Sequence, residues 1–143
     1  MSQFEGRAER FVMIIFVEAR EQVASAFRIQ FEREGIVLVG FGPIEFEAWL
    51  AGATKAELSG VECYLIGDTV ERARLVRSIR SRCRAPTVAL SDHTTLEKTL
   101  DLFACGVDDV VRKPVHVREI LARVRAIHRR SEPRAESAIA GQI

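Results

Sequence analysis

The stretch that decides the fold is Val107-Asp108-Asp109-Val110-Val111-Arg112-Lys113-Pro114. Gly106 before it ends a helical pattern, the paired valines make a short apolar strand, and Lys113-Pro114 turns the chain into a further helix. Lys113 is therefore predicted at the carboxyl end of a buried strand, where open α/β sheets place their ligand crevice. A cis bond before Pro114 would aim the lysine across the neighbouring strand ends.

Four other apolar segments predict strands at residues 11–17, 36–39, 61–66 and 87–90, beside the strand at 110–111. Helical periodicity follows each of them and predicts helices after Glu21, Pro43, Thr69, Thr95 and Pro114. Strands and helices that alternate with short connections predict a flavodoxin-like, doubly wound (βα)5 α/β fold. Its five-stranded parallel sheet should have the order 2-1-3-4-5.

Several local details are also predicted by this pattern. Gly40-Phe41-Gly42 is expected to be a turn, and residues 52–60 a connection. Asp68 or Thr69 should cap the third helix, and Thr94 or Thr95 the fourth. The fourth helix is expected to bury one stripe against the sheet, made of Leu96, Leu100, Phe103 and Ala104.

Composition indicates one domain with an adequate core, since 48% of the 143 residues are hydrophobic. A net charge of +1 argues against a protein that coats nucleic acid along its whole surface. The three cysteines have no CxxC spacing and are expected to be buried, reduced thiols. No apolar run is long enough to span a membrane and no export pattern is present, so the expected location is the cytoplasm.

Functional side chains are expected where the strands end. Glu18 follows the first strand, Asp68 follows Gly67 after the third, Ser91 ends the fourth and Lys113 the fifth. Carboxylates, a hydroxyl and an ammonium form a set that can bind Mg²⁺ and hold a phosphoryl group.

These residues resemble the receiver domains of OmpR-type response regulators, over residues 11–130. The likeness is most specific in residues 104–114 and the following helix, and the Ser91 to Lys113 spacing matches that between the family's switch hydroxyl and its lysine. Residues 106–123 and 83–86 further resemble the atypical FtcR/Rem-type flagellar transcriptional regulators. This resemblance implies control of flagellar genes.

The chain also departs from the receiver pattern. Ala19 and Arg20 stand where adjacent acids would help hold Mg²⁺, and Gly67 stands at the phosphoacceptor position with Asp68 one residue late. The following loop is short, and Val110 replaces an aromatic switch residue. Fewer ligands weaken a metal site. The expectation is therefore a degenerate, non-enzymatic pocket without metal or cofactor, made of Glu18, Gly67, Asp68, Ser91 and Lys113. In it, Lys113 would pair with Glu18 or Asp68.

The resemblance also implies a homodimer formed through the fourth helix, fifth strand and fifth helix. The matching charged positions are Asp108, Asp109, Glu119, Arg123 and Arg130. Their charges could complement one another across a twofold axis. The alternative is that they are solvated residues with local pairs, such as Glu119 with Arg123.

The expected organisation is a lead-in at residues 1–10, a receiver domain at 11–130 and a linker at 131–143. The linker would lead to a winged-helix domain beyond Ile143 that contacts DNA, and a histidine kinase partner is left open. Two other readings remain: a receiver that is phosphorylated on Asp68 with Mg²⁺, and a stand-alone module that binds a partner through the fourth and fifth helices.

Overall fold

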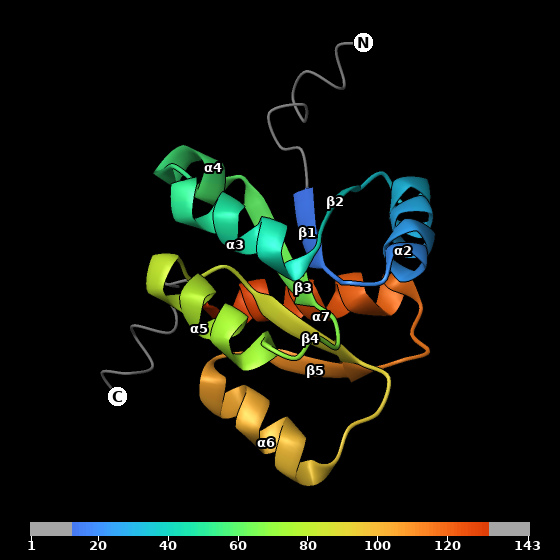
Figure 1. The fold of residues 1–143 in the computed structure, drawn as a ribbon. Coiled ribbons are helices and arrows are strands. Elements are labelled where there is room, and N and C mark those ends of the chain that lie inside the picture. Colours follow the sequence, from blue (N-terminus) through green and yellow to red (C-terminus); the bar gives the residue numbers. More distant parts are fainter. Residues whose placement is uncertain (1–12, 132–143) are drawn as a thin grey trace, which may run out of the picture.

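The computed structural model describes residues 13–131, which form a five-stranded parallel sheet in the order β2-β1-β3-β4-β5 (Figure 1). The strands are β1 (Met13–Val17), β2 (Val37–Phe41), β3 (Val61–Ile66), β4 (Thr87–Ser91) and β5 (Asp109–Arg112). The helices are α2 (Glu21–Arg33), α3 (Pro43–Gly52), α4 (Lys55–Ser59), α5 (Arg72–Arg82), α6 (Leu96–Cys105) and α7 (Val117–Ser131). The predicted fold class and strand order are confirmed. The predicted lead-in, residues 11 and 12, and the linker after residue 131 lie outside the described residues.

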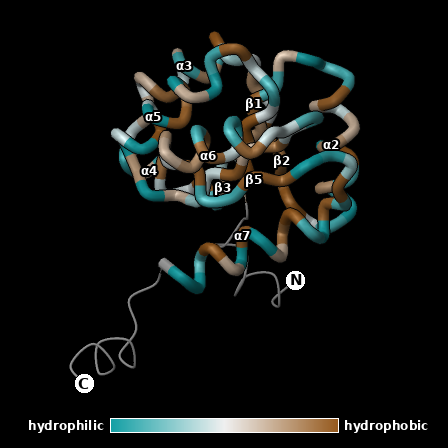
Figure 2. The backbone as a smooth tube through the Cα atoms, turned by 90° about the horizontal axis from the view of Figure 1, so that it is seen from below, coloured by the Kyte–Doolittle hydropathy of each residue, from teal (hydrophilic) through white to brown (hydrophobic). Residues whose placement is uncertain are grey.

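Helices cover both faces of the sheet. Alternate strand residues point to opposite faces, so Ile14 and Phe16 pack with α2 and α7, whereas Ile15 and Val17 pack with α3 and α5. Figure 2 shows apolar and polar residues alternating along α7. The buried face of α7 consists of Val117, Ile120, Leu121, Val124 and Ile127. These residues recur with the 3.6-residue period of a helix.

The segment between β1 and β3 differs from the prediction in one turn and contains one helix that was not predicted. Gly40 and Phe41 continue β2, paired with Phe16 and Val17 of β1, rather than forming a turn. Residues 52–60 contain the short helix α4. A capping box starts it: Thr54 Oγ1 accepts from the Glu57 N–H (3.1 Å), and Glu57 Oε1 accepts from the Thr54 N–H (2.8 Å).

The start of α5 also differs from the prediction. The helix begins at Arg72, and neither Asp68 nor Thr69 caps it, because the chain runs through an extra turn first. Thr95 does cap α6, accepting a hydrogen bond from the Lys98 N–H (3.1 Å).

The predicted buried stripe of α6 faces outward instead. Leu96 is 73% exposed, Leu100 57% and Phe103 43%, whereas Leu102 is the buried leucine of this helix. Periodicity located the stripe correctly, but it could not tell a core-facing stripe from one left open at the surface. An apolar strip on α6 is therefore accessible.

The cysteines are free thiols. Cys63 is buried as predicted, and burial raises the pKa of its thiol, while Cys83 and Cys105 are only partly buried.

Within residues 13–131, each helix is too short or too polar to cross a lipid bilayer.

Candidate functional site

The carboxyl ends of β1, β3, β4 and β5 meet at one edge of the sheet, and Lys113 lies there as predicted. The Lys113–Pro114 peptide bond is cis, and the Lys113 N–H donates to the Ser91 carbonyl oxygen (2.8 Å). The lysine Nζ lies 3.0 Å from Asp92 Oδ1 and 4.0 Å from Glu18 Oε1. Its nearer partner is thus Asp92, which the sequence did not single out.

Glu18 is the buried acid of the site, and its side chain has no exposed surface. The carboxylate accepts three hydrogen bonds from Arg20: from the backbone N–H (2.9 Å), from Nε (3.0 Å) and from Nη2 (3.1 Å). Burying a carboxylate is costly unless it is paired and hydrogen-bonded. Arg20 provides both, so the charge of Glu18 is held by a residue two positions farther along the chain.

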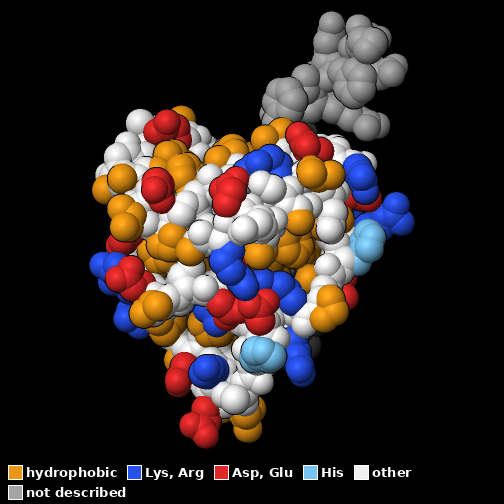
Figure 3. All heavy atoms as spheres, turned by 45° about the vertical axis from the view of Figure 1, so that its right-hand side comes forward, with side chains coloured by type: hydrophobic (Ala, Val, Ile, Leu, Met, Phe, Trp, Pro, Cys, Tyr) orange, Lys and Arg blue, Asp and Glu red, His pale blue; other side chains and the backbone are white. Residues whose placement is uncertain are grey.

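Arg20 also contacts Asp92, with Nη1 2.9 Å from Asp92 Oδ2. Two acids and two cations therefore alternate around a closed circuit, which we call the ionic ring: Glu18, Arg20, Asp92 and Lys113. The ion pair with Lys113 lowers the pKa of Asp92, and Arg20 adds to this effect. Hydrogen bonds to Glu18 and Asp92 raise the pKa of Arg20. Charged side chains of both signs lie side by side on this part of the surface (Figure 3).

Gly67 lies directly against the Glu18 carboxylate. A Cβ added at Gly67 would stand 2.5 Å from Glu18 Oε1, which is closer than real Cβ contacts. The Gly67 N–H donates to the Val17 carbonyl oxygen (2.8 Å), so the backbone is fixed at this position. The space that a side chain at residue 67 would need is taken by Glu18.

Asp68 is held by other partners. Its Oδ2 accepts from the Asp92 N–H (2.7 Å), and its Oδ1 lies 3.2 Å from Arg72 Nη2. The same arginine donates from Nη1 to the carbonyl oxygens of Gly67 (3.3 Å) and Leu90 (3.2 Å). Burial lowers the pKa of Arg72, against the opposing effect of Asp68. Of the two partners predicted for Lys113, Glu18 is therefore near it, while Asp68 is paired with Arg72.

Ser91 ends β4 with no exposed surface, and its hydroxyl has no hydrogen-bond partner among the described residues. The hydroxyl of Thr69 is buried in the same unpaired state. Ser91 thus lies at the site without taking part in the ionic ring.

The resemblance to receivers implies a Mg²⁺ ion at this edge, and the donor set can be compared with what Mg²⁺ needs. Mg²⁺ requires near-octahedral oxygen ligands and usually binds one or two carboxylates. The carboxylates of Glu18 and Asp92 are instead engaged by Arg20, and Ala19 offers no ligand. Within residues 13–131, no group of three or more His, Cys, Asp and Glu side chains is placed to hold a metal. As arranged, these residues do not fit Mg²⁺.

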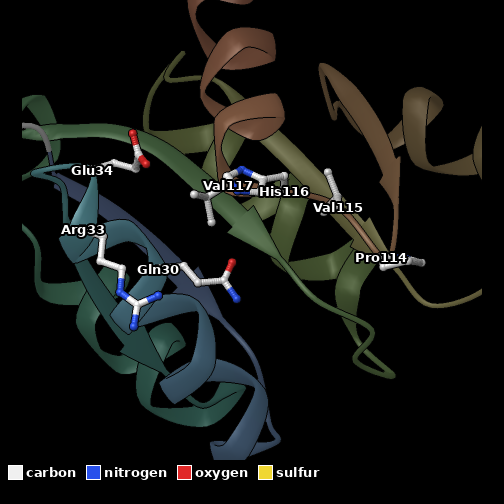
Figure 4. A pocket seen from close by; sticks show the side chains of 7 residues that line it. All are labelled: Gln30, Arg33, Glu34, Pro114, Val115, His116 and Val117. Atoms are coloured by element: carbon white, nitrogen blue, oxygen red, sulfur yellow. The ribbon is translucent and has the colours of Figure 1, made fainter.

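A groove runs along the surface next to the ionic ring. It has a volume of about 480 Å³ and lies between α2 and the start of α7 (Figure 4). Its lining consists of Gln30, Arg33, Glu34 and residues 114–117. An adjoining hollow of about 440 Å³ reaches Asp92 and Lys113. The ring is therefore accessible from this side.

The charged residues predicted for a dimer face lie in two different places. Arg123 on α7 pairs with Asp109 (3.0 Å) and Glu119 (3.0 Å), and Arg130 is exposed farther along this helix. Asp108 instead accepts from the Thr87 N–H (2.9 Å) and pairs with Arg80. Its carboxylate is committed within the chain.

The sequence reasoning missed three residues of the site: Arg20 as the partner of Glu18, Asp92, and Arg72. For Asp92 a signal was present, because an acid directly after a buried strand is placed at the ligand edge of an α/β sheet. For Arg20 the sequence indicates only that a basic residue replaces an expected acid, and it gives no sign of the pairing with Glu18.

No protein-family model matches the chain. The chain is 46% identical over 129 residues to the flagellar transcriptional regulator FtcR of Brucella abortus (strain 2308), covering 90% of this chain and 57% of that protein. It is 35% identical over 66 residues to the cell cycle transcriptional regulator CtrA of Caulobacter vibrioides, covering 46% and 29%. The chain thus spans little more than half the length of the FtcR relatives.

Similar solved structures have the same fold at low sequence identity. A two-component response regulator from Clostridium difficile has a TM-score of 0.70 at 17% identity, covering 85% of this chain and 99% of that one. HP1043, an orphan response regulator of H. pylori, has a TM-score of 0.65 at 18% identity, covering 79% and 96%.

Proposed function

Because this chain is a response-regulator receiver domain related in sequence to the flagellar transcriptional regulator FtcR, we propose that it regulates transcription without Mg²⁺-dependent phosphorylation. In this proposal it is the non-catalytic regulatory domain of a cytoplasmic DNA-binding protein that acts on flagellar genes. The DNA contacts would be made by a domain outside this chain, since the chain covers 57% of its FtcR relative.

One observation carries the proposal: Glu18 lies against Gly67 and is paired with Arg20. A phosphoacceptor needs a carboxylate where Gly67 has no side chain, and a Cβ there would stand 2.5 Å from Glu18 Oε1. It also needs a divalent cation to screen the phosphoryl group, whereas a guanidinium occupies the carboxylates that could bind one. Glu18 and Arg20 thus oppose both an acceptor carboxylate at position 67 and a divalent cation beside it.

The competing reading is phosphorylation of Asp68, and it can be tested directly. Purified protein is incubated with acetyl phosphate and Mg²⁺, and in parallel with beryllofluoride and Mg²⁺, beside a phosphorylatable receiver as positive control. We expect no added mass and no shift of the Asp68 and Ser91 amide resonances. A mass increase of one phosphoryl group, abolished by Asp68→Asn, would refute the proposal.

We further propose that the domain forms a homodimer through α6, β5 and α7. The exposed strip of Leu96, Leu100 and Phe103 supports this, because apolar side chains gathered on one helix face favour association. The pairs of Arg123 with Asp109 and Glu119 lie on the neighbouring elements and could exchange partners across a twofold axis. Arg130 belongs to this face, whereas Asp108 is left out because it binds Arg80.

Sedimentation velocity tests this face. Leu100→Glu and Arg123→Glu should each weaken self-association, whereas Ile44→Glu, which alters an exposed apolar residue at the start of α3, should not. Equal association of all variants and wild type, or a monomeric wild type, would exclude this dimer. The stand-alone partner-binding reading would then remain.

A further inference from the structure

Asp92 is held from three neighbouring strand ends at once. Its N–H donates to Asp68 Oδ2 (2.7 Å) after β3, its Oδ1 lies 3.0 Å from Lys113 Nζ after β5, and its Oδ2 accepts from Arg20 Nη1 (2.9 Å) after β1. Hydrogen bonds that involve an ionised group are shorter and stronger than neutral ones. The first residue after β4 is thus fixed in both its backbone and its side chain.

The segment that Asp92 begins leads directly into α6. Only residues 92–95 separate β4 from α6, and Thr95 is already the N-cap of the helix. Within this segment, the hydroxyl of Thr94 lies 2.6 Å from that of Thr99 in the first turn of α6. Because this segment is short, we expect a displacement of Asp92 to move the start of α6 as well.

The helix at the end of this segment carries the exposed apolar strip. It makes few inward contacts of its own, since Leu102 is its one large buried residue. A helix with few buried apolar contacts opens locally at a low cost in free energy. The orientation of Leu96, Leu100 and Phe103 should thus depend on how firmly Asp92 is held.

From these contacts we propose that the ionic ring is a built-in lock in which Arg20 performs the positioning role of a bound cation. By joining Glu18 to Asp92, Arg20 ties the end of β1 to the β4–α6 segment and keeps the strip on α6 in one fixed presentation. This inference rests on the proposed function, because it describes how the site acts when no phosphoryl group is attached. Arg20 and Asp92 are positioning residues in this scheme, and the unpaired hydroxyl of Ser91 has no part in it.

The contacts of the ionic ring can be broken by a substitution that leaves the volume of the side chain nearly unchanged. Asp92→Asn keeps the N–H bond to Asp68 but removes the charge that attracts Arg20 and Lys113. Asp101→Asn is the matched control, since Asp101 is exposed on α6 itself and outside the ring. Arg20→Gln opens the ring from its other side and provides a second variant in case Asp92→Asn does not fold.

Amide hydrogen exchange of the 143-residue chain measures the effect. We expect exchange at residues 92–105 to rise by about tenfold in Asp92→Asn and in Arg20→Gln, as in local opening of a segment that has lost its anchor. Amides of α3 should change less than about twofold, and Asp101→Asn should resemble wild type. Exchange at residues 92–105 that is unchanged in whichever ring variant folds would overturn the lock.

Phosphorylation of the wild type and hydrogen exchange of the ring variants test the proposed function and the lock separately. The same wild-type sample is treated with acetyl phosphate and Mg²⁺. Phosphorylation would refute the proposed function. An unphosphorylated wild type whose ring variants keep normal exchange would refute the lock alone.

Discussion

The carboxylate of Glu18 and the α-carbon of Gly67 are packed so closely that residue 67 has no space for a side chain. A Cβ there would stand 2.5 Å from Glu18 Oε1 and 3.3 Å from the Val17 carbonyl oxygen. Glu18 is in turn fixed by three hydrogen bonds from Arg20. Any side chain added at Gly67 must therefore displace a paired, buried charge.

Gly67→Ala should destabilise the protein by about 1–3 kcal/mol, the usual cost of overpacking. Gly52→Ala is the control, because a Cβ at Gly52 meets no atom within 4 Å. That change lies in α3 and should be neutral or stabilising by up to about 1 kcal/mol. Urea unfolding gives both values. Equal stability of the two variants would show that Glu18 yields its place without cost.

A double-mutant cycle attributes this cost to Glu18. In a Glu18→Ala background the carboxylate is absent, so Gly67→Ala should cost at least about 1 kcal/mol less than in wild type, as contacting residues couple. The free energies of unfolding of the four proteins give the coupling directly. A coupling near zero would place the clash elsewhere, for instance at the Val17 carbonyl.

Arg20→Gln should destabilise the protein by about 1–3 kcal/mol, because it leaves Glu18 buried with fewer donors. Arg118→Gln removes a comparable ion pair, with Glu34, from a side chain that is 76% exposed, and should cost less than about 1 kcal/mol. Thermal and urea unfolding compare the two. A larger loss for Arg118→Gln would contradict the importance of burial at Glu18.

Arg80→Met should be among the more destabilising arginine substitutions, costing about 2–4 kcal/mol. Arg80 donates to the carbonyl oxygens of Gly106 (2.9 Å) and Ala85 (2.6 Å) and pairs with Asp108, so its loss leaves several acceptors without a partner. Arg123→Met serves as control: it breaks pairs on a side chain that is 42% exposed and should cost less than about 1 kcal/mol. Similar unfolding midpoints for both variants would rule out a stabilising role for the three contacts of Arg80.

The contribution of Asp92 should disappear in acid. The folded state lowers the pKa of Asp92 below its ordinary value of 3.8, chiefly through Lys113. A group with a depressed folded pKa stabilises the protein fully above its unfolded pKa and loses this effect as the pH falls through the folded pKa. The stability difference between wild type and Asp92→Asn should therefore be constant above about pH 5 and shrink below about pH 4. Urea unfolding at a series of pH values measures it, and a difference that grows in acid would have the wrong sign.

Most of the fold could be predicted because its causes are local. The strand segments were continuous apolar runs, and the buried stripe of α7 followed the helical period closely, so both periodicities were visible in the sequence. Helix α4 was missed although Thr54 and Glu57 have the spacing of a capping box. Its five residues are too few to show a period.

The site was predicted less completely because its pairings depend on side-chain directions. Glu18, Ser91 and Lys113 were placed at the strand ends by topology alone, and the structure confirms that location. That Lys113 lies nearest to Asp92, and that Arg20 bends back to bind Glu18, are consequences of three-dimensional placement. The outward strip on α6 was mistaken for core because amphipathic spacing is the same whether the apolar face meets a sheet or remains open.

Arg20 differs from any metal ion in one respect: it is covalently part of the polypeptide. Its supply cannot be depleted by a chelator, diluted by the medium or exchanged for a competing ion. The protonation of its guanidinium also persists across the physiological range. The neutralisation of the Glu18 carboxylate by Arg20 therefore requires no diffusible cation.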